Sequence, residues 1–329
     1  MSAKAYSGKT ILISGGRGFI GSALAQSFVD VECRVILLDH LPNRFWLPQG
    51  KRAQYSSKLG DISLPETWKD VLPGVDYFFH FAALEYHRTS YDMFRDLQMN
   101  AISCLHCLEC CRINEFRPKI VFASSANLFG GGASLPVSES ARDNPPSLWS
   151  LHKLLAEHYF RVYAQTDGID SVSLRLSNVY GPTANPDVMK RSVVNRMIAN
   201  ALSGEPLVLF SNRNRIRDFV YLDDVVQAFL LAGRMNSLSD DNRFYVIGSE
   251  ERATYAEVGK LIANQVSASI EKTVVVEQDD SVSLEPLDSR DFVADSGLFC
   301  GQTGWVSRVS INDGIGLTIN AMKQGGISK

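Results

Sequence analysis

A glycine-rich turn between a short apolar strand and a helix constrains the fold of this chain more than any other feature. The strand is predicted at residues 10–14 (TILIS), the turn runs from Gly15 to Gly21, and residues 22–29 continue with helical periodicity. Glycine permits backbone angles that other residues avoid, and it lets a pyrophosphate approach the main chain. The helix N-terminus adds N–H groups and a positive dipole end. The pattern predicts a dinucleotide-binding turn made by Gly15, Gly18, Phe19, Ile20 and Gly21.

An acidic residue at the end of the second predicted strand indicates the type of dinucleotide. Asp39 follows the apolar run 34–38 (RVILL) and comes 18 residues after Gly21. A carboxylate at this place binds both ribose hydroxyls of NAD and repels the 2′-phosphate of NADP. We therefore expect NAD as the cofactor, while the basic residues His40 and Arg44 keep NADP open as an alternative.

Strands and helices alternate through the first half of the chain. Continuous apolar runs at 77–81 and 119–124 are typical of central parallel strands, buried on both faces. The alternation predicts an α/β fold: a Rossmann-type doubly wound parallel sheet with a smaller α/β substrate-binding lobe. No linker rich in Gly, Ser or Pro divides the halves, so we expect interleaved domains. The first would comprise residues 1–177 and about 216–247, and the second would comprise 178–215 and 248–329.

Charge and hydropathy exclude several classes of partner. The chain has 33 basic and 36 acidic residues and a net charge of −3, so no surplus of cations is available for nucleic acid. We also expect no membrane partner, since no apolar run approaches the ~20 residues that span a bilayer. The segment 1–9 is polar and does not resemble a signal peptide, which predicts a cytoplasmic location.

Four of the six cysteines fall within eight residues, at 104, 107, 110 and 111. Metal ligands usually converge from turns, whereas residues 93–112 contain no Gly or Pro and are predicted to form one helix. On a helix Cys104, Cys107 and Cys111 share one stripe, as small packing residues do. We therefore expect no metal site.

Further motifs, in the same order and at similar spacing, make this chain resemble the extended short-chain dehydrogenase/reductase family of nucleotide-sugar epimerases and dehydratases. The Gly-x-x-Gly-x-x-Gly form of the turn is one of them. The others are Gly60-Asp61-Ile62, His80-Phe81-Ala82-Ala83, Asn100, Ser124-Ser125, Lys153, Arg175–Pro182, Arg217–Asp224, Ala294-Asp295 and Gly304-Trp305. The resemblance extends from Lys9 to about Leu317, almost the whole chain.

The resemblance implies roles for individual residues. Around NAD it implies contacts from Asp61, Ile62, Phe81, Ala82, Ala83, Asn100 and Lys153. It implies that Ser125 hydrogen-bonds the reacting oxygen. It implies a nucleotide-diphosphate sugar as substrate, with Asn178 and Arg217 on the diphosphate and Arg290 as a further candidate. Relatives also pair two long helices per subunit, which implies a homodimer through helices 93–112 and 151–166.

The chain departs from the family at the catalytic base. The family places a Tyr four residues before Lys153, but position 149 is Trp. An indole N–H donates a hydrogen bond but has no useful acid–base equilibrium near neutral pH. Trp149 therefore replaces the family Tyr without supplying a base.

Four other groups could supply the base. Tyr86 and His87 follow the 77–83 strand end and, by resemblance, border the sugar; Glu85 is a third candidate there. Lys153 could act itself if its pKa is lowered. Alternatively, Tyr86 and His87 only shape the pocket or bind a sugar hydroxyl.

The residues after Ser125 restrict the reaction. Dehydratases of the family carry an Asp–Glu pair there, whereas this chain has Ala126 and Asn127. A 4,6-dehydratase is therefore disfavoured, and an epimerase or a sugar dehydrogenase/reductase is expected. The alternative is a catalytically weakened NAD- and nucleotide-sugar-binding protein with a sensing or scaffolding role, for which Trp149 is the argument.

Overall fold

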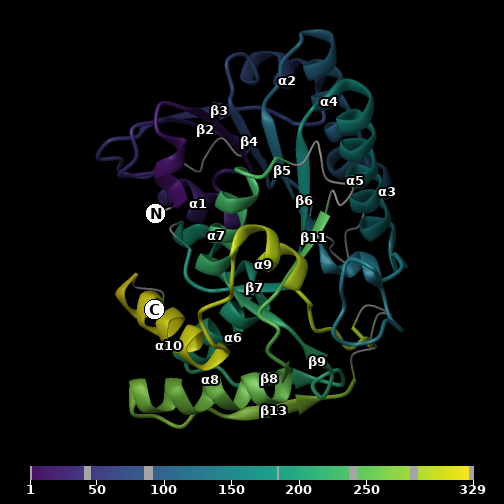
Figure 1. The fold of residues 1–329 in the computed structure, drawn as a ribbon. Coiled ribbons are helices and arrows are strands. Elements are labelled where there is room, and N and C mark those ends of the chain that lie inside the picture. Colours follow the sequence, from purple (N-terminus) through teal and green to yellow (C-terminus); the bar gives the residue numbers. More distant parts are fainter. Residues whose placement is uncertain are drawn as a thin grey trace. The chain divides into compact units, whose positions relative to one another are not determined.

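A seven-stranded sheet combines strands from residues 10–176 with one strand from residues 244–247 (Figure 1). The computed structural model describes residues 2–40, 46–84, 92–183, 185–236, 244–281 and 288–325. The strands of the sheet are β1 (Thr10–Ser14), β2 (Arg34–Asp39), β3 (Gln54–Leu59), β4 (Tyr77–His80), β5 (Lys119–Ser125), β6 (Ser171–Leu176) and β11 (Phe244–Ile247). Their order is β11-β6-β5-β4-β1-β2-β3, and the pairings from β3 through β5 are parallel.

The strand order reverses between β1 and β4, which confirms the predicted doubly wound arrangement. From β1 the chain runs outward to β3 on one side, and it then returns to build β4 on the other side. Ser14 and His80 are register partners at the carboxyl ends of these two strands. In open α/β sheets a ligand binds outside the carboxyl ends at this reversal.

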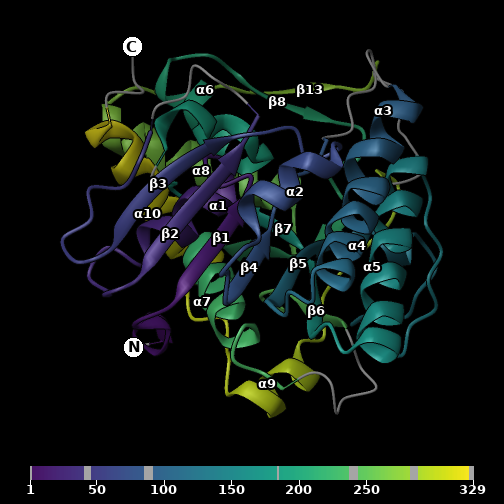
Figure 2. The ribbon, with the colours of Figure 1, turned by 90° about the horizontal axis from the view of Figure 1, so that it is seen from above.

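Helices cover both faces of the sheet. They are α1 (Phe19–Gln26), α2 (Pro65–Val71), α4 (Ser103–Ile113), α5 (Leu148–Asp167) and α7 (Leu222–Ala232). Side chains of α2, α4 and α5 share one buried cluster with Leu12 and Phe78, and Figure 2 shows these helices side by side. On the other face Phe229 of α7 packs on Phe81, with ring centroids 4.6 Å apart.

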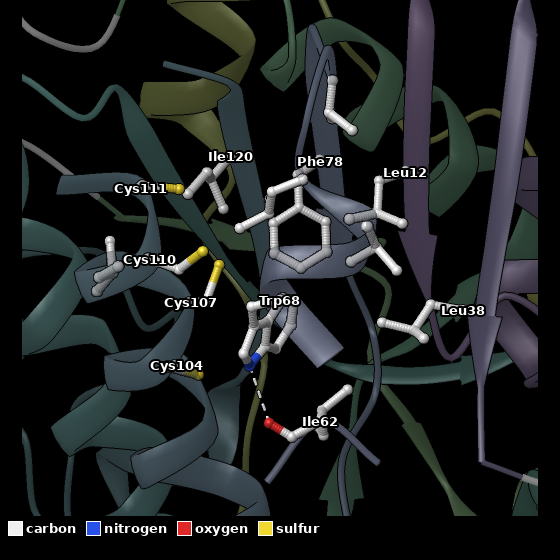
Figure 3. Packing of buried hydrophobic residues seen from close by; sticks show 14 of the residues in the cluster. Leu12, Leu38, Ile62, Trp68, Phe78, Cys104, Cys107, Cys110, Cys111 and Ile120 are labelled. Atoms are coloured by element: carbon white, nitrogen blue, oxygen red, sulfur yellow. Dashed lines mark hydrogen bonds between the residues drawn. The ribbon is translucent and has the colours of Figure 1, made fainter. Parts of the chain in front are cut away.

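The cysteines of α4 are packing residues, as the sequence predicts (Figure 3). Cys104, Cys107 and Cys111 are fully buried free thiols in the cluster that contains Trp68 and Phe78. Burial raises the pKa of Cys104 to about 11, so the thiol stays protonated near neutral pH. Across the described ranges, no three His, Cys, Asp or Glu residues are grouped to hold a metal ion.

The predicted helix 93–112 is interrupted in the structure. It consists of α3 (Met93–Leu97), a π-helical turn over Gln98–Ile102, and α4. A π-helical turn adds one residue to a helical turn and often occurs at functional sites. The predicted helix 151–166 begins three residues earlier, at Leu148, because the Ser147 hydroxyl caps it by accepting from the Ser150 N–H at 3.2 Å.

The chain divides into two compact units. The first comprises residues 1–128, 147–175 and 226–245, and the second comprises 129–146, 176–225 and 246–329. The helices of the second unit are α6 (Val193–Leu202), α8 (Tyr255–Ile270), α9 (Gly297–Thr303) and α10 (Ile311–Gln324). Its strands are β7 (Asn178–Tyr180), β8 (Leu207–Phe210), β9 (Ile216–Arg217), β10 (Phe219–Tyr221), β12 (Ala253–Thr254) and β13 (Val276–Asp279), which pair as β10-β7, β12-β9 and β13-β8.

This division differs from the predicted domains in two long segments, and by two residues at each of two other boundaries. Residues 129–146 belong to the second unit, because the Val137 N–H donates to the Val293 carbonyl at 2.8 Å. Residues 216–225 belong there as well, because β10 pairs with β7. No helix among the described residues is both long and apolar enough to cross a membrane.

Candidate active site

The glycine turn is closed tightly against the end of β4. Gly15 has φ +64°, and a Cβ added there would lie 2.8 Å from the Ala82 nitrogen. A Cβ at Gly21 would lie 2.2 Å from the Gly15 carbonyl oxygen. Gly18 is the N-cap of α1 and brings no side chain to the helix end. The turn thus leaves backbone where a pyrophosphate would approach, so these residues fit a dinucleotide.

Asp39 lies beside this turn, at the carboxyl end of β2. Its side chain is 9% exposed, and the Arg17 backbone N–H donates to its Oδ2 atom at 3.3 Å. The His40 N–H donates to Oδ1 at 2.9 Å. The carboxylate is therefore held next to the glycine turn, where a ribose would lie; Arg44 falls outside the described residues.

Asp61 is fixed by its neighbours. The Ser63 N–H donates to its Oδ1 atom at 2.9 Å, and Arg95 Nη2 donates to Oδ2 at 2.8 Å. Burial alone would raise the pKa of Asp61, but the hydrogen bonds from Arg95 and Ser63 lower it to about 2. The next residue, Ile62, is buried, and its carbonyl accepts from the Trp68 indole N–H at 2.9 Å. The turn expected at the adenine end is thus rigid and carries a negative charge.

His80, the last residue of β4, has a buried imidazole and directly precedes the segment predicted to border the nicotinamide. His80 Nδ1 lies 2.5 Å from Ser14 Oγ, and its Nε2 lies 3.3 Å from Cys104 Sγ. Burial, with the Lys153 charge, lowers the pKa of His80 to about 3, so the ring is neutral. Ser14 Oγ also accepts from the Ala82 N–H at 3.4 Å, which ties β1 to the Phe81-Ala82-Ala83 segment.

Ser125 and Lys153 lie where the sequence predicts a catalytic pair. Ser125 ends β5, and its Oγ accepts from the Asn127 N–H at 3.1 Å. Lys153 is 4% exposed, donates from Nζ to the Ala123 carbonyl at 2.8 Å, and lies 4.2 Å from the Phe122 ring centroid. Burial lowers the pKa of Lys153 to about 8, although Cys104, Glu157 and Asp96 oppose the shift. An ammonium with this pKa can give up its proton near neutral pH.

Trp149 lies one helical turn before Lys153, and its N–H is already used. Its Nε1 donates to the Leu84 carbonyl at 2.8 Å. Asn100, on the π-helical turn, contacts the same residue: its Nδ2 donates to the Leu84 carbonyl at 3.1 Å, and its Oδ1 accepts from the Leu84 N–H at 3.0 Å. The Trp149 indole therefore has a structural partner, and it supplies no acid or base near neutral pH. Glu85, Tyr86 and His87 lie outside the described residues.

The three predicted substrate residues lie in the second unit and are brought together there. Arg217 is 5% exposed and donates to the Asp288 carbonyl at 2.8 Å and to the Arg290 carbonyl. Arg290 is partly buried, and burial with the nearby Arg217 charge lowers its pKa to about 10. Asn178 Nδ2 donates to the Asp218 carbonyl at 2.9 Å. Two adjacent guanidinium groups can hold a diphosphate.

Two buried carboxylates, Asp218 in the second unit and Asp96 in the first, were not predicted as site residues. Asp218, fully buried, accepts from Ser177 Oγ at 2.9 Å and from the backbone N–H groups of Ser249, Glu250 and Ala294 at 2.8, 3.0 and 3.1 Å. Asp96, also fully buried, lies 2.5 Å from His152 Nδ1. The i, i+4 spacing of Asp96 and Asn100 was the available signal for the second, whereas nothing local marks the partners of Asp218.

The glycine turn leads to a prediction about cofactor affinity. Gly15→Ala should weaken NAD binding at least about tenfold, because the new methyl group would force the turn away from Ala82. Gly74→Ala is the matched control, since Gly74 has φ +73° and nothing within 4 Å of its added Cβ. Both variants should lose about 1 kcal/mol of stability from the positive φ. Isothermal titration with NAD checks this; equal affinities in the two variants would contradict it.

The lowered pKa of Lys153 leads to a prediction about stability. The unfolded chain holds this proton up to pH 10.5 and the folded chain only to about 8, so stability rises with pH across that window. The free energy of unfolding of the wild type, minus that of Lys153→Met, should increase by up to about 3 kcal/mol between pH 8 and 10.5. Urea titrations of the cofactor-free protein measure the difference. A flat difference would show that Lys153 titrates as in water.

Known proteins share both the sequence and the fold of this chain. The sequence profile of the NAD-dependent epimerase/dehydratase family matches residues 11–248. A protein of Methanocaldococcus jannaschii that is provisionally named a UDP-glucose 4-epimerase is 30% identical over 318 residues, which are 95% of this chain and 98% of that protein.

Solved structures agree with this match. The UDP-glucose 4-epimerase of Thermotoga maritima with UDP-glucose has a TM-score of 0.82 and 27% identity, covering 96% of this chain and 99% of that one. The Thermus thermophilus UDP-glucose 4-epimerase complex with NAD has a TM-score of 0.77 and 27% identity, covering 95% and 99%. The chain thus belongs to the NAD-dependent epimerase/dehydratase family.

Proposed function

We propose that this chain is an NAD-dependent enzyme that transfers hydride at a ring carbon of a nucleotide-diphosphate sugar, with a UDP-sugar as the substrate class. The relatives act on or bind UDP-glucose and NAD by their names, which supports both assignments. The observation that carries the proposal is Lys153, buried at the end of β5 beside the Ser125 strand end with its pKa lowered to about 8. The outcome is epimerisation, or oxidation or reduction of one carbon; Ala126 and Asn127 disfavour a 4,6-dehydratase.

The residues of the first unit would hold the cofactor and the reacting oxygen. The turn from Gly15 to Gly21 would hold the pyrophosphate, and Asp39 would bind the ribose hydroxyls. The chemistry supplied by bound NAD would be the acceptance and return of a hydride at the sugar carbon. Ser125 would hydrogen-bond the sugar oxygen. If another residue is the base, Lys153 would keep positive charge beside that oxygen, which stabilises an alkoxide as the proton leaves.

The second unit would bind the rest of the substrate. Arg217 and Arg290 supply two cationic groups close together, and Asn178 supplies an amide anchored on the Asp218 carbonyl. We assign the diphosphate to this cluster. The proton acceptor is one of Glu85, Tyr86, His87 and Lys153, since the Trp149 indole has no acid–base equilibrium near neutral pH. All six cysteines are free thiols, which supports a cytoplasmic location.

A turnover assay tests this function. Purified protein with NAD and a panel of UDP-sugars should give an isomeric sugar or reduced cofactor, read by chromatography with mass detection and by absorbance of reduced cofactor. Ser125→Ala should lower kcat about 100-fold, because it removes a donor to the reacting oxygen. Trp149→Tyr should raise kcat, because the gain from a phenol four residues before Lys153 should exceed the loss of the indole hydrogen bond to the Leu84 carbonyl. A sensing or scaffolding role, which the comparisons do not support, predicts binding without turnover in every variant.

A second pair of variants assigns the base. Loss of turnover in Tyr86→Phe with activity kept in His87→Ala would assign Tyr86, and the reverse result would assign His87. Activity in both variants would leave Glu85 and Lys153: loss of turnover in Glu85→Gln would then assign Glu85, and activity in that variant would assign Lys153.

We propose that the protein forms a homodimer through α3, α4 and α5. Leu151 and Val162 are 47% and 46% exposed on one side of α5, eleven residues and three turns apart. Phe94 on α3 is 74% exposed and Ile113 on α4 is 66% exposed. Exposed apolar side chains on neighbouring helices are typical of an interface.

Light scattering tests the dimer. Leu151→Glu combined with Val162→Glu should convert a dimer of the wild type to a monomer, because it places charges in the interface. Val208→Glu, at a 39% exposed position on β8, is the control and should leave the dimer intact. A monomeric wild type would exclude the interface.

A further inference from the structure

Five side chains or backbone groups around Leu84 form one connected polar chain. The Trp149 indole and the Asn100 amide both donate to the Leu84 carbonyl, at 2.8 and 3.1 Å. The Asn100 amide also donates to Asp96 Oδ1. Asp96 Oδ2 then lies 2.5 Å from His152 Nδ1. Asp96, Asn100 and His152 are 0%, 2% and 8% exposed, so little solvent competes for these hydrogen bonds.

These contacts fix the backbone at Leu84, which lies beyond the hydrogen-bonded ladder of the sheet. The ladder between β1 and β4 ends with the Phe81 N–H, which donates to the Ser14 carbonyl at 3.1 Å. Three residues later, both polar backbone groups of Leu84 are bound by side chains instead of by a strand. Ala82 and Ala83 lie between these two points. Whatever fixes Leu84 therefore also fixes the strand end expected to border the nicotinamide.

The buried carboxylate of Asp96 determines which groups of the network donate and which accept. As an acceptor, Asp96 fixes the Asn100 amide with its nitrogen toward the Leu84 carbonyl and its oxygen toward the Leu84 N–H. A buried carboxylate needs several donors, and His152 supplies one from the same helix as Trp149. Trp149 and His152 are three residues apart, so they lie on one side of α5. Both ends of the polar chain are therefore anchored on one helix.

We infer that Trp149 and the Asp96–His152 pair are positioning residues that hold Leu84, and through it the nicotinamide side of the site, in the reactive arrangement. The inference rests on the proposed function for its catalytic consequence. In place of a proton acceptor at position 149, this chain has a fixed donor. A small misplacement of reacting groups costs large factors in rate, so loosening Leu84 should act on kcat more than on binding.

Kinetics of four variants test the inference. Trp149→Phe and His152→Ala should each lower kcat about tenfold, while KM and the NAD dissociation constant change less than about threefold. His152→Gln should restore kcat to within about threefold of the wild type, because the Gln amide can donate to Asp96. The double variant Trp149→Phe, His152→Ala should lose no more than the worse single variant, since both break one chain of contacts.

The matched control is Trp305→Phe. Trp305 is 3% exposed, and its indole N–H donates to the Asp224 carbonyl at 2.9 Å in the second unit. The Trp305→Phe variant loses the same kind of hydrogen bond as Trp149→Phe, but it should keep kcat at the wild-type value. An unchanged kcat in Trp149→Phe would overturn the inference. So would losses that multiply in the double variant, or a His152→Gln variant as slow as His152→Ala, because His152 would then act on the substrate itself.

A separate measurement distinguishes failure of the inference from failure of the proposed function. If the wild type converts no nucleotide sugar, the proposed function fails, and hydrogen exchange then tests the network alone. The Leu84 amide, bound to Asn100 Oδ1 at 3.0 Å, should exchange at least about tenfold faster in Trp149→Phe and His152→Ala than in the wild type or Trp305→Phe. Equal exchange in all four proteins would overturn the inference.

Discussion

The close approach between the end of β1 and the end of β4 determines where everything else in the first unit lies. Gly15 lies so near Ala82 that no side chain fits between them, and Ser14 joins the two strand ends through His80 and the Ala82 N–H. The strand order reverses at this junction, so the glycine turn and the β4 segment face the same crevice. If the ends of β1 and β4 moved apart, the glycine turn that suits a pyrophosphate and the segment expected to border the nicotinamide would no longer be held at a fixed distance from each other.

Charges buried around this junction reduce stability and give the site its chemistry. Desolvation disfavours the charged form of Lys153, and the same region contains a neutral His80 and the carboxylate of Asp96. Arg175 and Glu157 form a further buried pair, with a shortest N–O distance of 2.6 Å, under the Phe244 ring. Such pairs contribute little net stability once desolvation is counted, but removing one partner leaves an uncompensated charge. The fold is thus intolerant of single changes here.

The sequence predicts the parts of the site that depend on local pattern. The glycine turn and Asp39 at a strand end follow from local spacing, whereas the roles of Ser125 and Lys153 are implied by the family resemblance. The structure has Ser125 at the end of β5 and Lys153 on the long helix α5, the elements expected. The doubly wound sheet follows from the alternation of apolar strands and helices, and the strand order confirms it.

Contacts between distant residues were beyond such reasoning. Asp96 meets His152 across 56 residues, and Asp218 binds N–H groups 31 to 76 residues away, so neither partner is marked by local spacing. The segment 129–146 also escaped prediction, because its place depends on an isolated β-bridge between Val137 and Ala294, 157 residues later. His152, next to Lys153 on α5, has its ring on Asp96, because a buried carboxylate needs a donor.

The π-helical turn at Gln98–Ile102 fixes the number of residues that the segment from α3 to α4 can contain. One residue in a regular helix corresponds to a rotation of about 100°. Deleting one residue there would give a straighter helix, yet it would turn the cysteine side of α4 away from Trp68 and Phe78 relative to Asp96. Conversely, the irregular turn lets a single element present a polar side to Leu84 at one end and an apolar side to the sheet at the other. The rotation of each residue about the helix axis therefore constrains α3 and α4 as much as residue type does. During evolution this segment can accept substitutions far more readily than insertions or deletions.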